Sequence, residues 1–122
     1  MKIEIPFKTP SINHLYGHHG HRKYLKPDAK KLREQINSLV QQDTCGLCDL
    51  EENKLKVVVE IYEDWYTQKG TVKKKDVSNR EKFLVDSVFT ALGLEDSFIF
   101  EHTMRKIQSN EEKAVIKIEV LE

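Results

Sequence analysis

Polar and apolar residues alternate along parts of the chain with the period of two that is typical of β-strands. The first such segment covers residues 2–7, and the strongest covers residues 54–66. The strongest segment is predicted to have two faces, with Leu55, Val57, Val59 and Ile61 on one and Val58, Glu60 and Tyr62 on the other. Residues 98–107 and 113–121 are predicted as two further strands, joined as a hairpin at residues 109–110.

Two other segments have apolar residues at the spacing of an amphipathic helix. The first begins at residues 27–28 and ends by residues 45–46, with an apolar face of Ala29, Leu32, Ile36, Leu39 and Val40. The second covers residues 79–92 and stops at Gly93, with an apolar face of Leu84, Val85, Val88, Phe89 and Leu92. The order β-α-β-α-β-β predicts an α+β (α/β) fold, in which two helices pack on one face of a mixed sheet of about four strands.

Length and composition narrow the class of protein. A chain of 122 residues without linkers or repeats suits one domain, so residues 1–122 are expected to form a single domain. No stretch reaches the roughly 20 apolar residues of a membrane span, and residues 1–5 lead into a strand without the apolar region of a signal peptide. Two cysteines are too few for a disulfide framework. We therefore expect a cytoplasmic protein with no membrane partner.

The 20 basic and 20 acidic side chains cancel in number but not in position. Residues 1–40 and 67–82 carry net charges of +5 and +4, whereas residues 41–66 and 83–122 carry −5 and −4. Affinity for a polyanion depends on local potential, so nucleic acid stays open as a partner. Solvated charged surfaces would give the same pattern. The first basic block includes residues 8–27, predicted to be a long irregular segment, and loops of this length are often functional.

Polar residues are densest at the junction between the strongest strand and the second helix, where residues 73–82 read KKKDVSNREK. Ser78 and Glu81 have the spacing of a capping box, in which each side chain satisfies a free backbone N–H group. Asp76 lies just outside the helix, and a capping role does not explain it.

Lys82 lies one turn inside this helix, on the face shared with Asn79 and Asp86. A second acidic pair, at residues 95–96, follows the helix at the end where its dipole disfavours negative charge, so a compensating cation is expected nearby. Acidic groups, a lysine and a basic run are what metal-assisted phosphodiester hydrolysis needs. Oxygen ligands hold Mg²⁺, the ion lowers the pKa of the attacking water, and a lysine stabilises developing charge.

The signature of the RusA family of Holliday junction resolvases (crossover junction endodeoxyribonucleases) resembles several pieces of this chain. The family pattern D-x-D-N-x-x-K, roughly L-x-D-A-L, a glycine and an acidic pair matches DVSNREK at 76–82, LVDS at 84–87, Gly93 and EDS at 95–97. The family segment P-S-x-N-x-x-Y is similar to PSINHLY at residues 10–16. Length and element order agree as well, so the resemblance covers nearly the whole chain.

The resemblance implies a homodimeric, Mg²⁺-dependent endonuclease, with Mn²⁺ able to substitute, that cuts branched four-way DNA in recombination and repair. Carried over by position, the catalytic residues are Asp76, Lys82 and Asp96, the metal ligands are Asp76, Asp96 and Glu95, and the supporting residues are Ser78 and Asn79. The residues expected to contact DNA are Asn13, Tyr16, Arg22, Lys23, Lys26, Lys73, Lys74 and Lys75.

Ser78 departs from the family pattern, which usually has its second aspartate there. A serine keeps the helix cap but loses a charged ligand, so either Mg²⁺ binds more weakly or Glu81, Glu95 or water takes its place. The alternative function is therefore a protein that binds junction DNA on the same scaffold without cutting it.

A helix over residues 79–92 is about 21 Å long, at 1.5 Å per residue. Asp76 and Asp96 would then lie at opposite ends of it, too far apart to share a metal unless the chain folds back sharply. We expect a composite site, in which Asp76 of one subunit meets Asp96 of the other across a two-fold axis.

Three further groups of residues were weighed. The C-x-x-C at residues 45–48 allows a zinc-stapled interaction module completed by histidines at 18–21, although loop residues without a metal explain it as well. His102 is expected to be a strand histidine with a satisfied hydrogen bond. An aromatic cluster is expected in the core or at a dimer interface rather than as a base-stacking platform: Tyr62, Trp65 and Tyr66.

Overall fold

The structure is a computed structural model that describes residues 1–9, 16–20, 22–41, 50, 53–74 and 78–121. Residues 16–19, 22–25 and 78–80 are described by their backbone only. Within these residues, no helix is long and apolar enough to cross a membrane.

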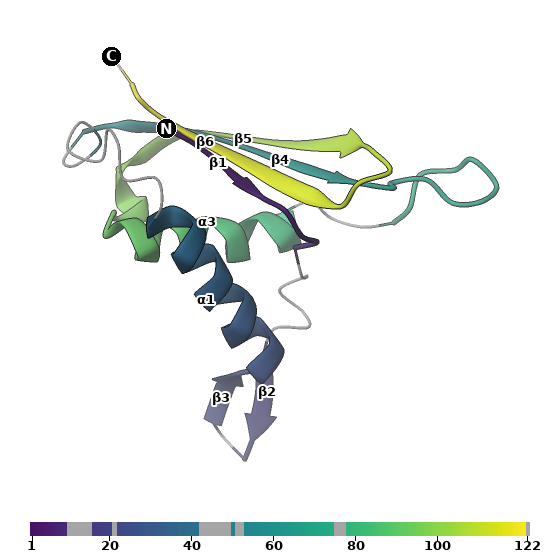
Figure 1. Cartoon of the computed structure of the whole chain (residues 1–122), viewed down its shortest axis with the longest axis horizontal. Helices are drawn as coiled ribbons and strands as arrows, with labels where there is room; N and C mark the ends of the chain where they lie inside the picture. Colours follow the sequence, from purple (N-terminus) through teal and green to yellow (C-terminus); the bar gives the residue numbers. More distant parts are fainter. Residues whose placement is uncertain (10–15, 21, 42–49, 51–52, 75–77, 122) are drawn as a thin grey trace.

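A four-stranded sheet forms one layer of the molecule (Figure 1). Its strands are β1 (Lys2–Ile5), β4 (Leu55–Glu63), β5 (Ile99–Gln108) and β6 (Lys113–Val120), in the spatial order β1-β6-β4-β5. β4 pairs in parallel with β5 and antiparallel with β6, and β6 pairs antiparallel with β1. The predicted mixed sheet of four strands is confirmed.

The predicted hairpin between the last two strands is wrong, because β4 lies between β5 and β6. On β4, Val57 is opposite His102 of β5 on one side and Ile118 of β6 on the other. The connection at residues 109–112 therefore crosses two strand spacings, roughly 10 Å, which four residues span easily. β4 has no exposed residue, whereas β5 is largely exposed, so burying the more apolar strand in the middle outweighs pairing with the nearest strand in sequence.

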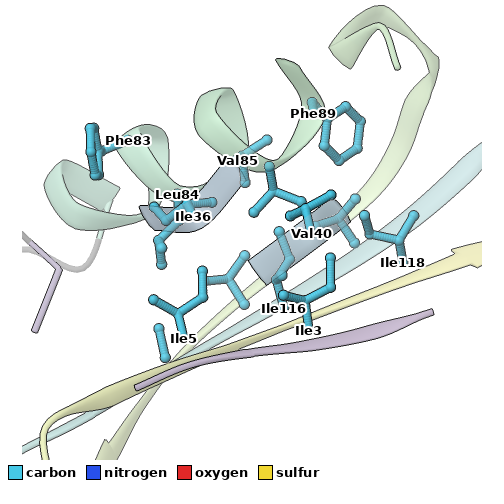
Figure 2. Close-up of a cluster of buried hydrophobic side chains, with 14 of the residues drawn as sticks. Ile3, Ile5, Ile36, Val40, Phe83, Leu84, Val85, Phe89, Ile116 and Ile118 are labelled. Atoms are coloured by element: carbon cyan, nitrogen blue, oxygen red, sulfur yellow. The ribbon is translucent and has the colours of Figure 1, made fainter. Parts of the chain in front are cut away.

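Two helices cover one face of this sheet, as predicted: α1 (Pro27–Gln41) and α3 (Ser78–Leu92) (Figure 1). Their apolar stripes meet the strand residues that point to the same side. Figure 2 shows this core, in which Ile36 and Val40 of α1 and Leu84 of α3 lie above Ile3 of β1 and Ile116 of β6. The apolar residues predicted to face inward from the second helix are all buried: Leu84, Val85, Val88, Phe89 and Leu92.

The expectation that residues 8–27 are irregular is wrong for part of this segment. β2 (Tyr16–His19) and β3 (Arg22–Leu25) pair antiparallel as a separate two-stranded sheet. Gly20 lies between them with φ of 62°, a left-handed conformation that glycine adopts without steric cost, so the turn can be tight. The pair lies beyond the N-terminal end of α1, away from the main sheet (Figure 1).

Gly93 ends α3, as predicted, and reverses the direction of the chain. Its φ is 71°. The Leu94 amide donates to the Phe89 carbonyl at 2.9 Å and the Gly93 amide to the Thr90 carbonyl at 3.2 Å, the bond pattern of a Schellman motif. A short 3₁₀ turn, η2 (Asp96–Phe98), then leads directly into β5. The acidic pair is thus returned towards the helix that precedes it.

In the described part of the chain, the other face of the sheet carries charged residues and no helix (Figure 1). The Glu60 carboxylate on β4 lies 3.5 Å from the Arg105 guanidinium of β5 and 3.3 Å from the Lys117 ammonium of β6, so it links the central strand to both neighbours.

Just beyond β4, Trp65 is buried, as expected for a core residue, and its indole N–H donates to the Ile61 carbonyl. Tyr66 is exposed.

Candidate active site

A polar pocket of about 380 Å³ lies between α3 and the start of β5. We call it the α3–β5 pocket, and the residues that line it are Glu81, Lys82, Val85, Asp86, Asp96, Ile99 and His102. Residues of α3 that are one turn apart lie on the same side of the helix, so Lys82 and Asp86 are neighbours there. The reversal at Gly93 brings Asp96 to this side of the helix, and β5 adds His102 from the helix-facing side of the sheet.

Asp86 and Asp96 bring two negative charges together in this pocket. The pKa of Asp86 is raised, and burial is the largest cause. The charge of Asp96 raises it further, whereas Lys82 and Arg33 act in the opposite direction. Two carboxylates that share a pocket repel each other when both are ionised. A cation between them would relieve this repulsion.

Arg33 on α1 supplies one such positive charge. It lines a neighbouring pocket of about 460 Å³, the α1–α3 pocket, together with Asp86, Glu95 and Asp96. Its Nε donates to the Ser87 hydroxyl at 3.4 Å, and its guanidinium lies 5.6 Å from the centre of the Phe83 ring. Arg33, on the other helix, thus shares a pocket with the acidic pair near which a compensating cation is expected.

Glu81 points to the sheet. Its Oε1 atom lies 3.0 Å from Nε2 of His102 on β5. The pKa of Glu81 is raised, and burial is the largest cause. His102 and Lys82 oppose this shift, whereas the charge of Asp86 adds to it. This contact gives His102 the hydrogen-bond partner expected of it. The same contact uses Oε1 of Glu81, one of the alternatives to a second aspartate as metal ligand, in a different interaction.

The candidate catalytic residues that the structure describes come together at this place. Lys82 and Asp96 line the α3–β5 pocket, and Glu95 lines the adjoining α1–α3 pocket with Asp96. Asp76 lies outside the described residues. Ser78 and Asn79 are described by backbone alone, in the first turn of α3, so the predicted capping box and their supporting roles stay predictions.

The structure describes one of the two residues on which the predicted composite site depends. Asp96 shares a pocket with Glu81 and Lys82 of the first helical turns, because the chain reverses direction after Gly93. The pairing of Asp76 with Asp96 across a dimer stays a prediction, since Asp76 lies outside the described residues.

Three residues of the site were not singled out as functional from the sequence: Arg33, Asp86 and His102. Asp86 carried a usable signal, its position one turn after Lys82 on the same face. Arg33 and His102 carried none, because α1 and β5 reach the site only through tertiary packing.

The residues expected to contact DNA are only partly described. Lys26 and Lys74 are exposed and Lys73 is half-buried, with its amide donating to the Trp65 carbonyl at 2.8 Å. Tyr16, Arg22 and Lys23 belong to the β2–β3 pair, which is described by backbone. Asn13 and Lys75 lie outside the described residues, as does the C-x-x-C of Cys45 and Cys48.

The donors around the two pockets suit a hard cation in type, because Asp86, Glu95 and Asp96 offer carboxylate oxygens. Among the described residues, however, no group of three or more histidine, cysteine or acidic side chains could hold a metal ion. Asp76 would be the additional donor. The described residues thus offer carboxylate donors but no complete set of metal ligands.

A pocket that combines carboxylates with a lysine and a histidine suits phosphodiester hydrolysis, and comparison with known families supports this class: endodeoxyribonuclease. The model of the family described as endodeoxyribonuclease RusA matches residues 6–119. The chain therefore belongs to the RusA family, and the resemblance seen in its motifs is confirmed. No individually curated protein gives a significant match to the chain.

Proposed function

We propose that this protein resolves Holliday junctions, cutting four-way DNA by phosphodiester hydrolysis during recombination and repair. Membership of the RusA family supports the class of enzyme and its substrate. The observation that carries the proposal is the convergence of Lys82, Asp86 and Asp96 on one pocket. In the sequence, a run of three lysines at residues 73–75 precedes the helix that carries Lys82. Lys82, Asp86 and Asp96 of this pocket all belong to the segments that match the family motifs.

The proposed site works with Mg²⁺, with Mn²⁺ able to substitute. Asp76, Asp96 and Glu95 would hold the ion, which when bound lowers the pKa of a water molecule and offsets charge on the phosphate. The mutual repulsion of Asp86 and Asp96 supports this assignment, because it leaves the pocket with a surplus of negative charge that a cation would relieve.

The residues of the chain bind and orient the substrate. Lys82 places a positive charge in the pocket, where it stabilises the charge that develops on the phosphate oxygens. Lys26, Lys73 and Lys74 bind the sugar–phosphate backbone of the junction arms and fix the register of the DNA.

The proposed assembly is a homodimer of single-domain subunits in the cytoplasm. A two-fold axis would present two identical sites to the junction, as required to nick two symmetry-related strands. One chain holds one α3–β5 pocket among its described residues, so two cuts made together need two chains.

The test is a labelled four-way DNA junction incubated with the protein in Mg²⁺ or Mn²⁺, next to a linear duplex of the same sequence. The proposal expects paired symmetric nicks in the junction, an intact duplex, and no cutting by Asp76→Asn or Asp96→Asn, both of which still shift the junction in a gel. The matched control Asp28→Asn alters an exposed aspartate on α1 and should cut normally. A junction that the wild-type protein binds but leaves intact in both metals would contradict the proposal and favour the non-cutting alternative with Ser78.

A further inference from the structure

We propose that His102, held in place by Glu81, is the proton acceptor for the attacking water in the α3–β5 pocket. This inference rests on the proposed nuclease function and adds a catalytic residue, His102, and a positioning residue, Glu81. It concerns the wall of the pocket that β5 provides, whereas the family motifs cover the loop and the helix.

The first argument is geometric. His102 Nε2 and Glu81 Oε1 are 3.0 Å apart, a distance at which an Nε2–H group donates to an ionised Glu81 carboxylate. The other ring nitrogen, Nδ1, then carries a lone pair and is the basic atom. A carboxylate that fixes the tautomer of a histidine and raises its basicity is a recurring arrangement in hydrolytic sites.

The second argument comes from burial. The Glu81 side chain is 11% exposed, whereas that of His102 is 29% exposed and lines the pocket. A buried carboxylate needs a partner to remain charged, and here the imidazole is that partner. The pair is thus anchored by its buried member, Glu81, while His102 lines the pocket in which a water would be bound.

The third argument comes from the groups that face His102. Asp86 and Lys82 face it from α3, Asp96 faces it from η2, and β4 presents only apolar Val57 beside it. Glu81, Asp86 and Asp96 provide the acidic groups of this pocket and Lys82 its positive charge. His102 therefore lies in the same pocket as Asp96, a proposed metal ligand, where the attacking water would be bound.

The proton and electron balance is simple. An O–H bond of the water breaks and its proton moves to Nδ1, while the oxygen forms a bond to phosphorus. One bridging P–O bond breaks and leaves its electron pair on the departing oxygen, which takes a proton from solvent. The imidazolium then returns its proton to solvent, so no other reactant is needed.

The test measures single-turnover cleavage of the junction against pH for wild type, His102→Ala and Glu81→Gln. We expect His102→Ala to lower the rate by about 10²–10⁴-fold, the usual contribution of a general base, and to remove the rising limb of the pH profile near neutrality. Added imidazole should restore part of the rate of His102→Ala. Glu81→Gln should lower the rate less and shift the limb, because it acts through His102.

Two controls separate the outcomes. Met104→Ala alters the next residue on the same side of β5, and gel shifts with melting curves confirm that each variant folds and binds junction DNA. If wild type cuts, and His102→Ala cuts as fast or is not rescued by imidazole, this inference is wrong and the nuclease function stands. If wild type does not cut, the proposed function fails and this inference fails with it.

Discussion

Asp86 in the middle of α3 and Asp96 in η2 line the same two pockets, the α3–β5 pocket and the α1–α3 pocket. The turn at Gly93 brings them together, and the charge of Asp96 contributes to the raised pKa of Asp86. This pair is the electrostatic centre of the site, with Lys82 on one side and Arg33 on the other. The predictions below test what the pair and its surroundings do.

Replacing a carboxylate of the pair should weaken metal binding directly. We expect Asp96→Asn to lower the affinity for Mn²⁺ by at least about tenfold, since the loss of even a supporting group around a metal costs this much. Isothermal titration without DNA measures this independently of cleavage. Asp28→Asn removes an exposed carboxylate of the same type and should bind Mn²⁺ like wild type. Equal affinities of wild type and Asp96→Asn would exclude Asp96 as a ligand.

The same pair makes stability depend on pH. Because the pKa of Asp86 is raised in the folded chain, mainly by burial, the folded state binds more protons than the unfolded state above pH 3.8. The free energy of unfolding therefore falls as the pH rises through that window to the raised pKa. Asn does not titrate, so Asp86→Asn should gain stability relative to wild type as the pH rises.

Urea melts of wild type and Asp86→Asn in EDTA, at several pH values between 3 and 7, measure this difference. The stability of the variant relative to wild type should be lowest below pH 3.8 and highest near pH 7. A relative stability that instead increases towards acid would show that Asp86 is stabilised as a charged group, contrary to its surroundings.

Lys82 is expected to act on the transition state. Lys82→Gln should reduce the cleavage rate at saturating enzyme by about 10²–10³-fold, the usual effect of removing one charge-stabilising donor, with little change in junction affinity. Lys31→Gln removes an exposed lysine on α1 and serves as the matched control. If Lys82→Gln weakened junction binding but left the rate at saturating enzyme unchanged, Lys82 would be a DNA-binding residue only.

Replacing a buried phenylalanine should cost much more unfolding free energy than replacing an exposed one. Phe83 on α3 is 2% exposed and Phe100 on β5 is 61% exposed. Phe83→Ala should cost about 3–5 kcal/mol of unfolding free energy, because it leaves a cavity under Arg33. Phe100→Ala should change it by less than about 1 kcal/mol. Thermal melts of both variants measure the contrast, and comparable losses would mean that Phe100 is covered in solution.

Much of the fold could be predicted from the sequence. The spacing of apolar residues indicates where a helix or strand lies, but it says less about which strands pair with each other. The alternation around Val57 and the stripe around Leu84 identified β4 and α3 within a few residues. Strand order was harder to predict. The short loop after Gln108 fits both a hairpin and a connection across β4, and only the competition for the central position decides between them.

For the site, local sequence identified the residues that share an element or adjoin it, namely Lys82 and Asp96. It could not identify Arg33 and His102, which lie on α1 and β5 and reach the pocket through the packing of these elements against α3. The Glu81–His102 contact joins residues 21 positions apart in the sequence. In the sequence, Glu81 is already explained by the capping-box spacing with Ser78, so nothing near it indicates a contact with His102.

The connection from β4 through α3 to β5 has a consequence for how the protein is made. Leu55 pairs with Ile99, so the β4–β5 pairing closes a long loop, and such non-local contacts form slowly. A growing chain therefore exposes Lys82, Asp86 and Asp96 before β5 can pair with β4. Until then the pocket lacks the side that β5 provides and Glu81 lacks its contact with His102, so the pocket cannot be complete before β5 has docked.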